Sequence, residues 1–415
     1  MSTESLTSIL KKDAKSLKNK RVLLRLDLNE EISTNGKLLD NFRIQSAVPT
    51  IKILRSAGAK IVIVSHLGRP EGKWDQSLSL KPIASCLAEM LDYKYVETDG
   101  KLPTYSIPHL VLFKNDITKS ESLEFLNDQS AQDIVMLENI RFYEGEDLNT
   151  NTFSEQLSKT ADLFVNDAFS VCHRAAASVV GVTKYLPSSA GPLLEKEIKA
   201  LEFMLSNKVA KPFVLMMGGI KIADKEQTLR NLGKRADKIL LAGGLANLFL
   251  KAQGYDVGVD VADKKSLALA KELLLNFKSK LVLPSDVAVK TIKSPNQAQA
   301  KQLSEIVATD KLYDIGPQSI LAFSKILKTA GTICWNGPLG YFEDKSFRAG
   351  TMAISNVIGG LGKRKAYVLV GGGETVASVR LAGQLEHIDH VSTGGGAMLE
   401  FLAGAKLPGI EALKK

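Results

Sequence analysis

Short runs of β-branched and other apolar residues recur along the chain, as expected for buried β-strands. Stretches with apolar residues at helical spacing separate many of these runs, for example residues 79–91, 264–277 and 318–327. Strands that alternate with helices predict parallel sheets whose two faces are both covered. The runs that predict strands are residues 22–26, 61–64, 134–137, 163–165, 213–216, 239–241, 281–283, 332–334 and 367–370.

A cluster of Pro, Ser and Gly at residues 185–192 (YLPSSAGP) predicts a break between two halves of the chain. The amphipathic run LLEKEIKALEFML follows directly and predicts a stiff connecting helix. Each half has its own set of predicted strands. We therefore expect an α/β fold of two doubly wound, Rossmann-like parallel-sheet domains joined by a hinge helix, with residues 1–188 in the first domain and residues 189–403 in the second.

The chain of 415 residues carries a formal net charge of +9, which suits nucleic acid or small phosphorylated metabolites as partners. A basic surface without a dedicated partner is the alternative. The three cysteines are far apart and no CxxC pair occurs, which favours neither a disulfide framework nor a cysteine zinc site. The N-terminal segment lacks the apolar core of a signal peptide, and the longest apolar stretch, residues 239–250, is too short to span a bilayer. We expect a cytoplasmic protein.

Two common nucleotide-binding signatures are missing from the sequence. No Gly-Lys pair is followed by Ser or Thr, so there is no Walker A loop. No GxGxxG segment follows a predicted strand, which argues against the usual dinucleotide-binding fingerprint. Any nucleotide site in this chain is therefore built in another way.

Polar residues follow the predicted strands of the first half, where the functional residues of doubly wound folds gather. Arginine offers a planar fork of donors that matches phosphate and carboxylate oxygens, so several arginines together can hold a small polyanion by its ends. Taken alone, each arginine is more often a surface salt-bridge partner, and the two histidines are alternatively structural. These residues are Asp27, Asn29, Arg43, His66, Arg69, Arg141, His173 and Arg174.

Glycine-rich turns follow the predicted strands of the second half. Glycine lets backbone N–H groups approach phosphate oxygens, and the N-terminus of a following helix adds favourable potential. A helix that starts near Lys221 places Lys221 and Lys225 on the face of its first turn, an arrangement that suggests a compensating anion such as a nucleotide phosphate. Glu374 follows a glycine triplet and is a candidate ligand of the accompanying magnesium. The turns are residues 218–219, 243–244, 371–373 and 394–396.

The segments that carry these residues resemble the signature segments of phosphoglycerate kinases, in the order and spacing of that family and along nearly the whole chain. They read RVLLRLDLN, SHLGRP, LENIRF, NDAF with HRAAAS, GGIKIADK, WNGPLGYFE, GGGETVAS and STGGGA. The resemblance implies a glycolytic or gluconeogenic kinase that transfers a phosphoryl group reversibly between 1,3-bisphosphoglycerate and ADP, giving 3-phosphoglycerate and ATP. It also implies in-line transfer after hinge closure.

The resemblance implies one substrate pocket on each domain. The first domain would bind 3-phosphoglycerate through Asp27, Asn29, Arg43, His66, Arg69, Arg141 and Arg174. The second would bind MgADP or MgATP through Lys221, Lys225, Gly243, Gly244, Asn336, Pro338, Glu343, Gly371, Gly372, Gly373 and Thr375. Glu343 would meet the ribose, Glu374 would be the ligand of Mg2+, and the groups at the transferring phosphoryl would be Arg43, Lys221, Gly372 and Gly395. The tail, residues 404–415, would pack back on the first domain.

Three positions depart from the pattern of that family. Glu374 stands where the family has Asp, which lengthens the arm of the metal ligand by one methylene. Ile220 replaces a small residue near the phosphates, and Glu30 and Glu31 replace Val and Pro close to an anion site. None of these changes removes a group that the chemistry requires, so we expect activity to be retained.

A non-catalytic nucleotide- or nucleic-acid-binding protein is the rival interpretation of the basic charge. It predicts basic residues interleaved with exposed aromatics, whereas only 6% of the residues are aromatic and the arginines follow strands. A kinase of the same fold acting on a different small acid stays open. We expect a monomer that binds neither nucleic acid nor membranes.

Overall fold

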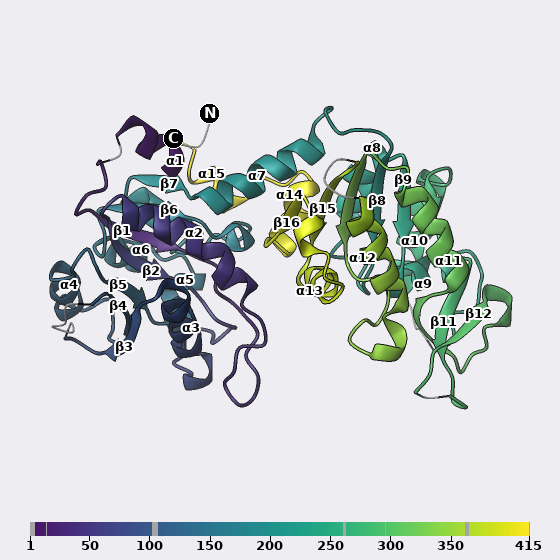
Figure 1. Cartoon of the computed structure of the whole chain (residues 1–415), viewed down its shortest axis with the longest axis horizontal. Coiled ribbons are helices and arrows are strands. Elements are labelled where there is room, and N and C mark those ends of the chain that lie inside the picture. Colours follow the sequence, from purple (N-terminus) through teal and green to yellow (C-terminus); the bar gives the residue numbers. More distant parts are fainter. Residues whose placement is uncertain are drawn as a thin grey trace. The chain divides into compact units, whose positions relative to one another are not determined.

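The computed structural model describes residues 5–13, 15–101, 107–259, 263–294, 296–361 and 365–414. The chain divides into two compact units (Figure 1). Unit 1 comprises Met1–Ile198 with Lys406–Lys415, and unit 2 comprises Lys199–Ala405. The boundary between the units lies inside helix α7 (Pro192–Leu205), the helix predicted from the amphipathic run. The predicted α/β fold with two parallel sheets is confirmed.

Unit 1 is built on a seven-stranded sheet with the strand order β3-β4-β5-β2-β1-β6-β7. All of its neighbouring strands pair in parallel. The edge strand β7 lies within the segment that the sequence marked as a break. The strands are β1 (Arg21–Arg25), β2 (Lys60–Val64), β3 (Lys94–Thr98), β4 (His109–Phe113), β5 (Ile134–Leu137), β6 (Leu163–Asn166) and β7 (Ser188–Ala190).

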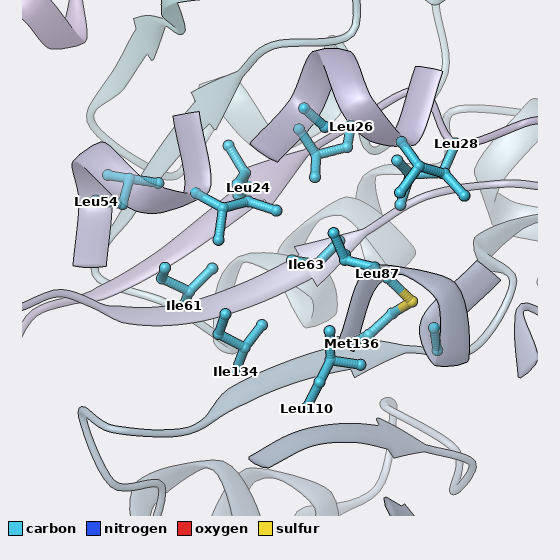
Figure 2. Close-up of a cluster of buried hydrophobic side chains, with 14 of the residues drawn as sticks. Leu24, Leu26, Leu28, Leu54, Ile61, Ile63, Leu87, Leu110, Ile134 and Met136 are labelled. Carbon is cyan, nitrogen blue, oxygen red and sulfur yellow. The ribbon is translucent and has the colours of Figure 1, made fainter. Parts of the chain in front are cut away.

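Apolar side chains from the central strands and two helices form the main core of unit 1. Figure 2 shows Leu24 and Ile63 from β1 and β2 beside Leu54 and Leu87 from α2 and α3. The helices of unit 1 are α1 (Leu6–Lys12), α2 (Phe42–Ser56), α3 (Lys81–Leu91), α4 (Ser120–Asn127), α5 (Glu144–Asp147), α6 (Asn151–Ser158) and α15 (Pro408–Glu411). Short 3-10 helices are η1 (Gln76–Leu78), η2 (Ile140–Phe142), η3 (Phe169–Val171) and η4 (Gly181–Lys184).

The C-terminal segment contacts unit 1. Gly409 N donates to the backbone oxygen of Cys172 at 2.8 Å. A Cβ atom on Gly409 would press against Val179 and Cys172, so the close approach of α15 depends on the absence of a side chain there. Of the tail, residue 415 lies outside the described residues.

Unit 2 is built on a six-stranded parallel sheet with the order β10-β9-β8-β14-β15-β16. A three-stranded antiparallel sheet, β12-β11-β13, accompanies it. The strands are β8 (Phe213–Met217), β9 (Lys238–Leu241), β10 (Leu281–Val282), β11 (Asp286–Lys290), β12 (Gln299–Gln302), β13 (Lys311–Ile315), β14 (Thr332–Asn336), β15 (Tyr367–Gly371) and β16 (His390–Ser392).

Helices flank the sheet of unit 2 in Figure 1. They are α8 (Glu226–Arg235), α9 (Gly243–Ala252), α10 (Lys264–Asn276), α11 (Pro317–Leu327), α12 (Ala349–Leu361), α13 (Gly373–Leu381) and α14 (Gly396–Leu402), with the 3-10 helices η5 (Leu303–Glu305), η6 (Lys345–Phe347) and η7 (Leu385–His387). Within the described residues, no helix combines the length and apolar composition that crossing a bilayer requires.

The sequence pattern missed strands β3, β4, β7, β16 and the antiparallel sheet. Strand β3 (KYVET) is an edge strand with partly exposed residues, so it lacks the continuous apolar run of a central strand. Strand β12 (QAKQ) is polar and mostly exposed. Strands β3 and β12 form because a neighbouring strand offers backbone partners, which local hydrophobicity does not reveal. Strand β4 (HLVLF) is mostly apolar and fully buried, so its signal was present in the sequence and was overlooked.

Asp314, on β13, is a buried carboxyl in unit 2 with 5% of its surface exposed. It accepts hydrogen bonds from Gly350 N at 2.6 Å and from Ile315 N at 2.9 Å. Burial outweighs these bonds and raises the pKa of Asp314 from its ordinary value of 3.8 to about 7.

The raised pKa predicts a pH dependence of stability. Between pH 4 and 7 the carboxyl of Asp314 ionises in the unfolded chain before it ionises in the folded one, so its contribution to stability falls as pH rises through this window. Asp314→Asn removes that dependence. We expect the free energy of unfolding of the variant minus that of the parent to increase by up to about 4 kcal/mol as the pH is raised from 4 to 8.

Urea denaturation followed by the fluorescence of Trp335 measures this difference, because Trp335 is buried on β14 of the same unit. A Trp74→Phe background removes the other tryptophan, which lies in unit 1. A difference between the two proteins that stays constant from pH 4 to 8 would contradict the prediction.

Candidate active site

The polar residues predicted as a site in unit 1 follow four strands that are neighbours in the sheet, in the order β5-β2-β1-β6. Because these strands are parallel, their carboxyl ends lie at one edge and their loops meet there. The loop residues are Asp27, Asn29 and Arg43 after β1, His66 and Arg69 after β2, Arg141 after β5, and His173 and Arg174 after β6.

His66 lies at the centre of a group of guanidiniums. Its side chain is 4% exposed. The pKa of His66 lies well below its ordinary value, first because burial disfavours the imidazolium and then because nearby arginines repel a further positive charge. His66 is therefore neutral near pH 7. In decreasing order of effect the arginines are Arg25, Arg141, Arg43 and Arg174, and with His66 they are called the arginine cluster below.

Arg25, the last residue of β1, was not among the residues that the sequence singled out. Its side chain is 1% exposed. Its guanidinium donates to Ser178 Oγ at 2.9 Å and to Leu26 O, and its Nη2 lies 3.3 Å from His66 Nδ1. Glu146 favours the charged form of Arg25, which partly opposes the lowering of its pKa by burial. The usable signal was an arginine inside the predicted apolar run 22–26, since arginine is rarely buried without a partner.

The loops after β1 and β2 are held together by side chains of the predicted site. Arg43 Nη1 donates to Asp27 Oδ2, which also accepts from Ser170 Oγ. Asn29 N donates to Asp27 Oδ1 at 3.1 Å. Asn29 Oδ1 in turn accepts from Gly68 N at 2.8 Å. Asp27 and Asn29 therefore orient Arg43 and the loop of His66.

Arg141 is a buried member of the cluster, with 6% of its surface exposed. Its Nη1 donates to Gly68 O at 2.7 Å, and its Nε lies 3.6 Å from Asp147 Oδ1. Burial lowers the pKa of Arg141 to about 10. The guanidinium is still charged near pH 7. Its hydrogen bond to Gly68 O also holds the loop after β2 in place.

Arg174 and Arg69 complete the set. Arg174 is half-buried, and its Nε donates to His173 Nε2 at 3.4 Å. Arg69 directly follows Gly68 and is exposed, which leaves its guanidinium accessible to a ligand in solution. The structure thus gathers Arg43, Arg141 and Arg174 around His66, whereas Arg69 lies at the solvent-facing side of the same loop.

The residues predicted as a site in unit 2 also lie on loops that meet at one sheet edge. They follow five neighbouring parallel strands, in the order β9-β8-β14-β15-β16. The loop residues are Gly243 and Gly244 after β9, Lys221 and Lys225 after β8, Asn336, Pro338 and Glu343 at and after β14, Gly371, Gly372, Gly373, Glu374 and Thr375 at and after β15, and Gly395 after β16.

Hydrogen bonds link four of these loops into one surface, called the glycine platform below (residues 218–219, 243–245, 336–338 and 371–375). Gly219 O accepts from Leu245 N at 2.8 Å, and Gly219 N donates to Pro338 O at 3.0 Å. Asn336 Nδ2 donates to Gly371 O at 2.9 Å. The buried hydroxyl of Thr375 accepts from the N–H of the residue after Asn336, Gly337, at 2.7 Å.

Gly372 sets the conformation of the platform before α13. Its φ of 95° lies in the region that favours glycine, and it is the N-cap of α13. The first turn of α13 contains Glu374, which is exposed. An N-terminus bordered by glycines is suited to binding anionic oxygens, because its backbone N–H groups are accessible and the helix dipole favours negative charge.

The expectation that Lys221 and Lys225 share the first turn of a helix is wrong. Helix α8 begins at Glu226, Lys225 is its N-cap, and Lys221 lies earlier in the loop, where it is exposed. Residues 223–225 form a turn before the helix, in which Lys225 N donates to Ile222 O at 2.9 Å. Burial lowers the pKa of Lys225, while Asp224 and then Glu374 act in the opposite direction. Lys225 therefore lies within electrostatic reach of Glu374.

Other predicted residues are more loosely connected to the platform. Glu343 is exposed, and its carboxylate forms no hydrogen bond or ion pair with the described part of the chain. Gly395 is the N-cap of α14, with a φ of 50°. Met398 of α14 packs against Gly371, since a Cβ atom on that glycine would collide with its sulfur. Ile220 is 81% exposed and so blocks no interior space.

Comparison with known proteins gives the same match over nearly the whole chain. The family model of phosphoglycerate kinase matches residues 12–405. The chain is 40% identical to phosphoglycerate kinase of Pelotomaculum thermopropionicum over 96% of this chain and 97% of the relative. It is also 40% identical to that of Prochlorococcus marinus over the full length of both.

Solved structures agree with the sequence relatives. Phosphoglycerate kinase from Coxiella burnetii superposes with a TM-score of 0.79 at 35% identity and covers 99% of each chain. Phosphoglycerate kinase from Pyrococcus horikoshii OT3 superposes with a TM-score of 0.81 at 32% identity, covering 96% of each chain. Because the family model and relatives of 40% identity cover nearly its whole length, the chain belongs to the phosphoglycerate kinase family.

Proposed function

We propose that the chain catalyses reversible phosphoryl transfer between 1,3-bisphosphoglycerate and ADP, giving 3-phosphoglycerate and ATP. The arginine cluster is the observation that carries this proposal, because Arg25 contacts His66 and three guanidiniums of predicted site residues lie close enough to lower the pKa of the same histidine. Such a concentration of positive charge is costly unless an anion offsets it. A small acid with a phosphate at one end and a carboxylate at the other supplies anionic oxygens for both ends of the cluster.

The nucleotide belongs on the glycine platform in this proposal. Backbone N–H groups near Gly372 and the lysines Lys221 and Lys225 would bind the phosphates, while Glu343 would meet the ribose. Lys225 is half-buried and close to the platform, which suits ground-state binding. Lys221 is exposed in the same loop and is free to meet the phosphoryl group during transfer. We assign Lys221 mainly to the transition state and Lys225 mainly to nucleotide affinity.

The reaction needs no general base. The attacking oxygen comes from ADP in one direction and from the carboxylate of 3-phosphoglycerate in the other, and both are ionised near neutral pH. Catalysis therefore depends on alignment and charge neutralisation. Arg43 and Lys221, with the backbone N–H groups around Gly372 and Gly395, would stabilise charge on the transferring phosphoryl group.

Glu374 is the side chain that would hold Mg2+ together with the phosphates of the nucleotide. Magnesium in nucleotide sites commonly uses one or two carboxylates plus phosphate oxygens and keeps several waters. An exposed carboxylate in the first turn of α13, within electrostatic reach of Lys225, fits that donor set. When bound, the ion neutralises phosphate charge.

We also propose that the two substrates are brought together by a hinge motion. One substrate would bind to unit 1 and the other to unit 2, and in-line transfer requires both in one space from which water is excluded. Helix α7 is the candidate hinge, because it contains the boundary between Ile198 and Lys199. Three cysteines, all free thiols, suit the reducing cytoplasm that we propose as the location of the enzyme.

The proposed activity predicts ATP-dependent turnover of 3-phosphoglycerate by the purified protein. A coupled assay with glyceraldehyde-3-phosphate dehydrogenase and NADH reports the 1,3-bisphosphoglycerate formed. Replacing 3-phosphoglycerate with glycerate, lactate or acetate keeps a carboxylate but removes the phosphate, and we expect turnover to fall below detection. Equal turnover of an unphosphorylated acid would favour a kinase that acts on a different substrate.

The positions of Arg69 and Arg141 predict two different outcomes on truncation. Arg69 is exposed, so Arg69→Ala should weaken 3-phosphoglycerate binding roughly tenfold or more without changing the melting temperature, because a charge-assisted hydrogen bond contributes about 1.5–3 kcal/mol. Arg141→Ala should weaken the same binding and also lower the melting temperature, because it removes the bond to Gly68 O. Calorimetry with each ligand and thermal denaturation measure these effects.

Lys73→Ala is the matched control, since it removes an exposed positive charge from the same loop as Arg69. We expect it to leave acid binding nearly unchanged. MgATP binding should stay intact in all three variants. Equal losses of affinity for the acid and for MgATP in Arg69→Ala would show that the two sites are not separate.

The longer arm of Glu374 predicts a metal-dependent effect of Glu374→Asp. Magnesium and manganese take the same carboxylate and water ligands, but magnesium demands near-ideal octahedral geometry at short distances, so a carboxylate with the reach usual in the family should favour magnesium. We expect turnover with magnesium to rise or stay equal and any advantage of manganese to narrow. Glu374 is exposed, so stability should not change. Turnover of the parent and of Glu374→Asp, each with magnesium and with manganese, measures this effect. A large loss of magnesium-dependent turnover in the variant would show that the metal site is built around glutamate.

A further inference from the structure

We propose that Glu30 is a positioning residue that sets the place of Arg43 at the start of α2. This inference rests on the proposed binding of 3-phosphoglycerate at the arginine cluster. Glu30 lies in the loop after β1, only 7% of its surface is exposed, and its carboxylate contacts the first turn of α2. Glu30 Oε1 accepts from Arg43 N at 2.6 Å and lies 3.4 Å from Ile44 N.

The first turn of α2 needs such an acceptor from outside the helix. The first N–H groups of a helix have no partner within it, and Asn41, the N-cap of α2, makes no side-chain capping bond. Asp40 Oδ1 accepts from Asn41 N at 2.7 Å and from Phe42 N at 3.1 Å. Glu30 takes the next two N–H groups. Two carboxylates thus share this end of the helix, and the helix dipole favours both.

Glu30 and Asp27 hold the two ends of the same arginine. Glu30 binds the backbone N–H of Arg43, while Asp27 Oδ2 accepts from its guanidinium. Both carboxylates belong to one short loop, in which Glu30 N donates to Leu28 O at 2.9 Å. The position of Arg43 relative to the other arginines is therefore fixed by the loop after β1 rather than by α2 alone.

The contacts also explain why a second negative charge near an anion site is tolerated. The carboxylate of Glu30 is directed at helix N–H groups, so its charge is offset locally. Glu31, the next residue, is exposed and holds the loop through its backbone oxygen, which accepts from Leu39 N at 2.9 Å. Only Glu30 of this pair reaches Arg43.

Steady-state kinetics of Glu30→Ala test the proposal. We expect the KM for 3-phosphoglycerate to rise about tenfold, the ratio that corresponds to 1.4 kcal/mol, while the KM for MgATP stays within about twofold. Glu30→Gln keeps an acceptor oxygen for Arg43 N, so it should restore most of the affinity for the acid. Glu31→Ala removes an equal charge from the neighbouring position and should change neither constant.

Asp40→Ala separates positioning from capping. It removes the other carboxylate from the same helix end, so it should lower the melting temperature to a similar degree as Glu30→Ala but leave the KM for 3-phosphoglycerate unchanged. If both variants lose stability and neither loses acid affinity, Glu30 is a cap and the proposal is wrong. If the parent enzyme itself fails to turn over 3-phosphoglycerate, the proposed function fails instead. Should Glu30→Ala be too unstable to assay, Glu30→Gln against Glu30→Asp provides the same comparison of KM.

Discussion

The parallel direction of the strands is the constraint on which both candidate sites depend. In a parallel sheet every strand ends at the same edge, so loops from distant parts of the sequence meet there without further guidance. Residues 27–43, 66–69, 141 and 174 come together in unit 1 because β5, β2, β1 and β6 are neighbours. The same rule brings together four glycine-rich turns in unit 2. Hydrogen bonds between loops then fix the details.

The site edges of the two sheets present positive potential by different means, with arginine side chains in unit 1 and backbone N–H groups in unit 2. Unit 1 concentrates guanidiniums, and it supports the most buried of them, Arg25, with the buried carboxylate of Glu146 through the shared partner Ser178. Breaking such a buried network would leave an uncompensated charge, which is why its members act as a unit. Unit 2 relies on backbone N–H groups and few side-chain charges. A rigid backbone surface suits nucleotide phosphates, whereas paired arginines suit a small acid with two anionic ends.

The sequence could predict the fold class and most of the site, because central strands and glycine turns leave local signals. It could not predict strands such as β12, whose polar residues pair only because β11 is beside them. Arg25 was overlooked although it interrupts the apolar run 22–26, because its contacts with Ser178 and His66 depend on tertiary burial. The loop before α8 was assigned to a helix because the spacing of Lys221 and Lys225 fits one, whereas residues 223–225 form a turn and the helix starts only at Glu226.

Departures from a family pattern are best judged by where their side chains go. Ile220 is 81% exposed, so its bulk displaces no group of the protein, but its side chain lies beside Gly244 of the glycine platform. Glu30 looks unfavourable in a list of charges near an anion site, yet its carboxylate is bound to Arg43 N and faces a helix dipole. Glu374 is exposed in the first turn of α13, so no neighbouring side chain in the described part of the chain fixes the position of a carboxylate that is one methylene farther from the backbone than the Asp of the family. Glu374 and Ile220 therefore both lie at the proposed nucleotide site, while Glu30 acts on the acid site through the arginine it holds.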